Sequence, residues 1–115
     1  YPARWISAHS DRLDAEEAGH VAHFQGAANV EARIAALRAF DMDDALGAID
    51  TPTLLVVAED DMLVPDICSE RLAQGLPNAA LARMTGGHAC NVTEPLIFAK
   101  IVDAFLCGAT LEGAS

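Results

Sequence analysis

The sequence predicts an α/β protein in which a helical segment, residues 1–50, precedes a strand–helix–strand–helix unit, residues 51–108. Two observations predict this arrangement. Apolar residues recur at helical spacing before Pro52 and show no strand pattern there, whereas two short apolar runs alternate with helical patterns after it. A strand–helix–strand crossover makes the two strands parallel. Residues 109–115 are expected to form a tail.

Two helices and a short acidic turn are expected in the first half. The stretch from Leu13 to Phe24 has apolar residues at helical spacing and stops at Gly26. The stretch from Asn29 to Phe40 places three aliphatic side chains on one stripe. The acidic piece from Asp43 to Ile49 then leads to the breaker Asp50-Thr51-Pro52.

The second half predicts two strands and two helices. Thr53 to Ala58 is a continuous apolar run, as in a strand buried on both faces of a parallel sheet. Asp66 to Leu76 predicts a helix, and Ala79 to Met84 a weaker strand. Thr93-Glu94-Pro95 opens a last helix, with threonine as its cap and proline in its first turn, and Gly108 closes it.

Composition and charge exclude several classes of partner. The chain has 115 residues, of which 52% are hydrophobic, so one globular domain is expected. Seventeen acids against seven bases give a net charge of −10, which disfavours nucleic acid and anionic membranes as partners.

Three scattered cysteines, Cys68, Cys90 and Cys107, form no C-x-x-C pair and indicate free thiols in a reducing compartment. A soluble, cytoplasmic protein is expected.

Two loops hold the residues that indicate chemistry. Glu59–Pro65 follows the first predicted strand, and Gly86–Asn91 follows the second. The carboxyl ends of parallel strands share one edge of the sheet, where such folds bind ligands. One loop carries three carboxylates and the other carries His88 after two glycines. A carboxylate that orients an imidazole forms half of a nucleophile–His–Asp relay, so His88 is the candidate base.

These loops resemble those of the α/β-hydrolase family. The run from Leu55 to Pro65 is similar to the family's acid loop, in which the catalytic aspartate lies four residues before the proline. That register implies Asp61 as the acid, rather than Asp60 or Glu59. Gly87-His88 followed by Glu94-Pro95 resembles the family's histidine loop and the start of its last helix.

The resemblance also implies which part of the fold is present. Family members order their site Ser, Asp, His, with serine on a G-x-S-x-G elbow. This sequence has no such elbow and begins at Tyr1 rather than methionine. The chain is therefore expected to be the carboxy-terminal portion of an α/β-hydrolase, with the nucleophile upstream and residues 1–50 forming a helical cap over the pocket.

A narrower resemblance is to the aminoacrylate hydrolases of the bacterial pyrimidine-utilisation pathway. It is carried by Gly86–Thr93 with Pro95, by Leu63-Val64-Pro65 with Cys68-Ser69, and by Tyr1-Pro2, Trp5, Ala22–Gly26 and Asn29 in the cap. It implies hydrolysis of 3-aminoacrylate to malonic semialdehyde and ammonia without a cofactor. His23, inside the cap stretch, becomes a candidate substrate-binding residue.

Other interpretations of these residues stay open. His88 fits a packed histidine, and Asp61 fits a cap for the helix that starts near Asp66. Glu16, His20 and His23 share a helix face, but no fourth ligand is identifiable, so no metal is expected. Cys90 lies only two residues after His88, which favours packing over a role as nucleophile.

Competing functions also stay open. They are an α/β-hydrolase that acts on esters and a non-catalytic binding or assembly module. The strand from Thr53 to Ala58 expects a neighbour on each side, and only one is available within the chain. We therefore expect the missing amino-terminal half, or a second copy of the chain, to pair with it.

Overall fold

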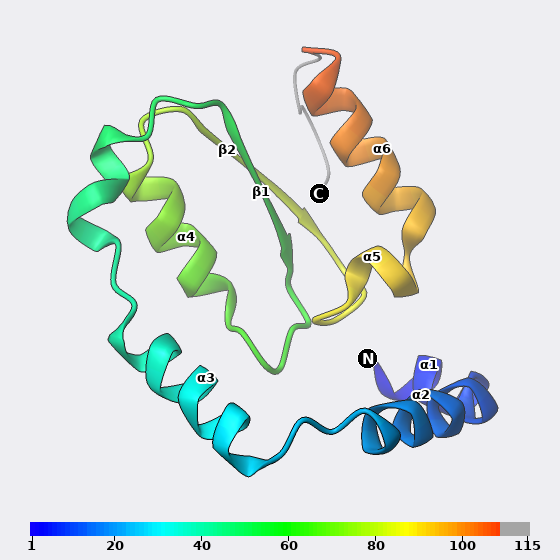
Figure 1. The fold of residues 1–115 in the computed structure, drawn as a ribbon. Helices are drawn as coiled ribbons and strands as arrows, with labels where there is room; N and C mark the ends of the chain where they lie inside the picture. Colours follow the sequence, from blue (N-terminus) through cyan, green and yellow to red (C-terminus); the bar gives the residue numbers. More distant parts are fainter. Residues whose placement is uncertain (109–115) are drawn as a thin grey trace.

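A computed structural model describes residues 1–108, and Figure 1 shows their path. The elements in chain order are α1 (Ala3–Ala8), α2 (Ser10–Ala22), α3 (Ala27–Ala39), a 3-10 helix η1 (Asp43–Ala48), β1 (Thr53–Ala58), α4 (Asp66–Gly75), β2 (Ala79–Met84), α5 (Cys90–Thr93) and α6 (Pro95–Leu106). The predicted tail, 109–115, lies outside the described residues. None of the described helices is long and apolar enough to cross a membrane.

The two strands lie side by side and parallel, as the sequence predicts. Thr53 pairs with Ala79 at one end and Ala58 pairs with Met84 at the other, so all six residues of each strand are in register. Figure 1 shows α4 on one side of the strands and α6 on the other. Both strands coincide with their predicted bounds because apolar runs end at clear breakers on each side.

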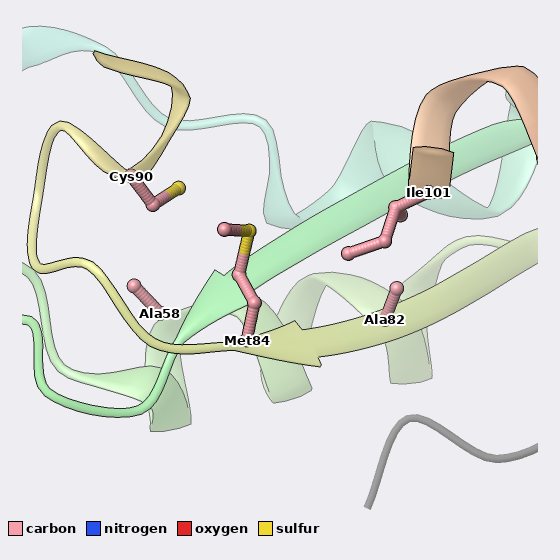
Figure 2. Close-up of a cluster of buried hydrophobic side chains, with 5 residues drawn as sticks. All are labelled: Ala58, Ala82, Met84, Cys90 and Ile101. Atoms are coloured by element: carbon pink, nitrogen blue, oxygen red, sulfur yellow. The ribbon is translucent and has the colours of Figure 1, made fainter. Parts of the chain in front are cut away.

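A small apolar cluster fills the space between the strands, α5 and α6. Figure 2 shows its buried members, Ala58, Ala82, Met84, Cys90 and Ile101. Ala82 and Met84 reach the same side because alternate residues of a strand face the same way. Ile101 comes from the apolar face of α6, and Cys90 from the first turn of α5.

An ion-pair cluster joins the opposite side of the sheet to α4. Arg83 of β2 donates to Glu70 and, at 3.4 Å, to Asp66, and lies 3.8 Å from Glu59. The hydrogen bond to Glu70 is the main reason that the pKa of Arg83 is raised above its ordinary value. Such a partly exposed cluster contributes little to stability, and it links Asp66 and Glu70 of α4 to β2.

The helices of residues 1–50 add little to the buried core. They contribute one buried apolar residue, Leu46 of η1. Gly26, at φ +91°, makes the break between α2 and α3 that the sequence predicts. The Cα radius of gyration is 17.0 Å, against about 13 Å for a compact domain of this length.

The predicted last helix differs from α6 at its start. Thr93 was expected as the cap, but Glu94 holds the N-cap position without a side-chain hydrogen bond, so this prediction is wrong. The Thr93 hydroxyl instead donates to the carbonyl oxygen of Gly86 at 2.7 Å. A further short helix, α5, ends at Thr93, which leaves that hydroxyl facing the histidine loop rather than the amides of α6.

Candidate active site

Parallel pairing brings the loops after β1 and β2 to one edge of the sheet. The register pairs Ala58 with Met84, and the Glu59 amide donates to the Met84 carbonyl oxygen at 2.9 Å. The acid loop, Glu59–Pro65, and the histidine loop, residues 85–89, therefore leave the sheet as neighbours. This is the arrangement predicted from the strand order.

Asp61 and His88 are in direct contact. The ring Nδ1 of His88 lies 2.9 Å from Oδ2 of Asp61. The Asp61 side chain is 12% exposed and the His88 side chain 51%, so the acid is sheltered while the rest of the ring is accessible. The structure confirms that Asp61, rather than Asp60 or Glu59, is the carboxylate in contact with the His88 ring.

The second oxygen of Asp61 is held by its own loop. Oδ1 accepts hydrogen bonds from the amides of Leu63 at 2.8 Å and Val64 at 3.1 Å. Burial favours the protonated carboxyl, but the Val64 amide, the His88 ring and the Leu63 amide outweigh it, so the pKa of Asp61 lies below its ordinary 3.8. Asp61 does not cap α4, whose N-cap is Pro65.

The backbone beneath His88 is held by a second aspartate. Oδ1 of Asp60 accepts hydrogen bonds from the amides of both Gly86 and Gly87, each at 2.9 Å. The two glycines have φ of +127° and +69°, a conformation that side-chain-bearing residues rarely adopt. The contact of Asp60 was not predicted from the sequence, although an acid at the exit of one strand opposite paired glycines at the exit of the next is a signal for it.

A cavity of about 530 Å³ opens beside the pair. Its walls are the acid loop, the histidine loop and the start of the chain: Tyr1, Pro2, Ala3, Asp60, Asp61, Met62, Leu63, Gly87, His88 and Ala89. Stacking of the Tyr1 ring on Trp5, with centroids 4.3 Å apart, fixes the orientation of the Tyr1 wall. An acid–imidazole pair facing such a space can take a proton from a nucleophile or water and return it to a leaving group.

Comparison with known proteins identifies relatives of the chain. No family model matches it. It is 54% identical over 99 residues to a RutD protein of Agrobacterium fabrum, covering 85% of this chain and 38% of that protein. It is 56% identical over 107 residues to RutD of Rhizobium rhizogenes, with 92% and 41% covered, and 50% identical over 115 residues to RutD of Variovorax paradoxus, with 98% and 43% covered. Their names give carbamate hydrolase as a provisional activity.

A solved structure agrees with these relatives. The crystal structure of MGS-M2, an α/β-hydrolase from a Medee basin deep-sea metagenome library, superposes with a TM-score of 0.72 at 25% identity, over 98% of this chain and 42% of that one. The chain is a RutD homologue with the α/β-hydrolase fold. It spans about two fifths of the length of the curated relatives it matches.

Other candidate residues of this RutD homologue lie apart from the pair. His23 ends α2, where its Nδ1 lies 2.8 Å from the Gly19 carbonyl oxygen, and it is not among the cavity-lining residues. Its predicted role in substrate binding stays a prediction. Glu16 receives a hydrogen bond from Arg12 at 2.8 Å. Within residues 1–108, no group of three potential ligands is placed to hold a metal.

Cys90 behaves as a packing residue in this RutD homologue. Its side chain belongs to the buried cluster. Burial is the largest cause that raises the pKa of the thiol, and the nearby charges of Asp61 and Asp60 raise it further. A thiol that resists ionisation is a poor nucleophile, which agrees with the structural role expected from the sequence.

Proposed function

We propose that the protein hydrolyses a carbon–nitrogen bond in a small molecule, with 3-aminoacrylate as its substrate. Water and 3-aminoacrylate give malonic semialdehyde and ammonia, a step in bacterial pyrimidine breakdown. The observation that carries the proposal is the 2.9 Å contact between His88 and Asp61 beside an open cavity. The RutD relatives support a hydrolase, and the resemblance of the histidine loop supports the substrate.

In this proposal His88 is the general base, and Asp61 is the ionised carboxylate that orients the His88 ring. Protonation of the carbon beside the carboxylate first converts the enamine to an iminium ion. Water then adds to the C=N bond while the ring accepts one of its protons. The ring returns that proton to the nitrogen, which leaves as ammonia as the remaining hydroxyl group loses its proton and becomes the aldehyde. Asp61 holds Nδ1, keeps the opposite nitrogen free for proton transfer and stabilises the charged ring. A carboxylate whose pKa is lowered stays ionised at neutral pH, as this role requires.

The nucleophile is proposed to come from a preceding part of the protein, on a G-x-S-x-G elbow. Residues 1–50 would then cap the pocket, and that preceding part or a second copy of the chain would pair with the free edge of β1. We place the activity in the cytoplasm, which fits three cysteines that form no disulfide. No metal or cofactor is needed for this chemistry.

A carbamate is the second candidate substrate, because the names of the RutD relatives give that activity. Carbamate hydrolysis also breaks a carbon–nitrogen bond and releases ammonia, so the same acid–base pair would serve. The carbon product separates the two: malonic semialdehyde from aminoacrylate, bicarbonate from carbamate.

The test uses the protein as its gene encodes it, with both substrates offered separately. Product formation above the uncatalysed rate is followed by NMR, together with ammonia release. His88→Ala should reduce product formation to the uncatalysed rate. His20→Ala, a change on the exposed face of α2, should leave the catalysed rate unchanged. Hydrolysis of a simple ester alone would overturn the substrate assignment, and activity that survives His88→Ala would overturn the role of the pair.

A further inference from the structure

Two adjacent aspartates act on the histidine loop in different ways. Asp61 contacts the His88 ring at 2.9 Å, whereas Asp60 contacts the main chain that carries it. Both side chains come from the same loop after β1, so the ring and its backbone are fixed by neighbouring residues. The proposed chemistry uses Asp61 and assigns nothing to Asp60.

The contact of Asp60 is a small cradle of backbone amides. Gly86 and Gly87 are buried, and both donate to the single oxygen Oδ1 at 2.9 Å. Successive amides converge on one acceptor in this way when the backbone turns through positive φ, as it does here at +127° and +69°. An acceptor at this place satisfies two donors that would otherwise be buried without partners.

The rest of the loop is fixed by other contacts that leave this side to Asp60. The Gly86 carbonyl oxygen accepts from the Thr93 hydroxyl at 2.7 Å, and the Cys90 amide donates to the Gly87 carbonyl oxygen at 3.1 Å. These bonds hold the carbonyl groups toward α5. Asp60 holds the amide groups toward the acid loop, which is the side on which the ring must meet Asp61.

We propose that Asp60 is a positioning residue that holds the Gly86–Gly87 backbone so that the His88 ring stays paired with Asp61. The function of Asp60 is to place an acceptor oxygen, and its negative charge is not required. For its catalytic consequence the inference rests on the proposed hydrolase function, but the loop geometry itself is testable without any substrate.

Two substitutions separate the position of the oxygen from its charge. Asp60→Asn keeps an acceptor oxygen in place and removes the charge, whereas Asp60→Glu keeps the charge and displaces the oxygen by one methylene. Glu59→Gln is the matched control, because Glu59 is an exposed neighbour whose carboxylate lies 3.8 Å from Arg83 rather than on the histidine loop. All three are made in the protein as its gene encodes it.

The first readout is NMR, with amide hydrogen exchange at Gly86 and Gly87 and the ring nitrogen shifts of His88. We expect Asp60→Asn and Glu59→Gln to match the parent. Asp60→Glu should accelerate exchange at both glycines by about tenfold, in line with a lost hydrogen bond, and should shift the Nδ1 signal. The strand amides of β1 report whether each variant is folded.

The second readout is kinetic. Asp60→Glu should lower kcat by about 10²-fold with little change in KM, because a small misplacement of the base mainly affects proton transfer. Asp60→Asn should retain most of the kcat of the parent. The inference would be overturned if Asp60→Asn lost its kcat as Asp60→Glu does. It would also be overturned if Asp60→Glu left amide exchange and the His88 ring shifts unchanged. If the parent hydrolyses neither substrate, the proposed function fails, while exchange and ring shifts still decide the role of Asp60.

Discussion

Replacing Gly86 by alanine should destabilise the protein by about 1.5–4.5 kcal/mol. Gly86 has φ +127°, where an L side chain is strained, and a Cβ built there lies 2.6 Å from the Thr93 hydroxyl oxygen and 3.1 Å from Cys90 Cα. The backbone strain costs about 1–3 kcal/mol. Displacement of the hydroxyl from the Gly86 carbonyl oxygen adds about 0.5–1.5 kcal/mol. The Cys90 Cα cannot move aside as a flexible side chain would.

The matched control is Gly19→Ala in α2, where no atom lies within 4 Å of an added Cβ. That change should stabilise the helix by about 0.5–1 kcal/mol. Urea unfolding followed by circular dichroism measures both free energies of unfolding. Equal midpoints for the two variants would refute the reasoning, because they would mean that the histidine loop relaxes freely around a Cβ.

Four further predictions follow from the site and the sheet. In the protein as its gene encodes it, His88→Ala should lower turnover by about 10²–10⁴-fold, Asp61→Asn by less and His20→Ala hardly at all; equal losses at His20 and His88 in steady-state rates would revive a metal at α2. The 115-residue chain alone should show no hydrolysis above background, and turnover that disappears with His88→Ala would contradict this. Folding lowers the pKa of Asp61 from its ordinary value of 3.8, so the ionised carboxylate stabilises the protein at pH values above 3.8. This stabilisation is lost as the pH falls through the lower pKa of the folded state. The urea midpoints of the parent and Asp61→Asn should therefore converge at acidic pH. Light scattering on the isolated chain should show self-association through the free edge of Thr53–Ala58, and a folded monomer at micromolar concentration would count against it.

The strands and long helices were predictable because their signals are local. Thr53–Ala58 and Ala79–Met84 are bounded by breakers, and both appear with those bounds. The helices α1 (Ala3–Ala8) and α5 (Cys90–Thr93) were not predicted, because six and four residues carry too little periodicity to reveal an apolar face. Their formation depends on contacts that the sequence does not display.

The site was predictable in part, for a similar reason. Strand order alone brings an acidic loop beside His88, but choosing Asp61 among three acids needed the register of a known family. The contact of Asp60 escaped prediction because its partners are main-chain amides, and their direction depends on the φ values of Gly86 and Gly87. Composition shows that glycines are present and does not show which way their amides turn.

Hydrogen bonds between the two loops, rather than a large core, account for the geometry of the Asp61–His88 pair. Within residues 1–108 no side chain is less than 2% exposed, and β1 pairs with β2 alone. Yet Asp60 and Asp61 reach residues 26 to 27 positions away along the chain through bonds of 2.9 Å. The link is one crossover whose strands are in register up to Ala58 and Met84. Once that register is set, both loops leave the sheet at fixed positions, and two adjacent carboxylates are enough to place the histidine backbone and orient its ring.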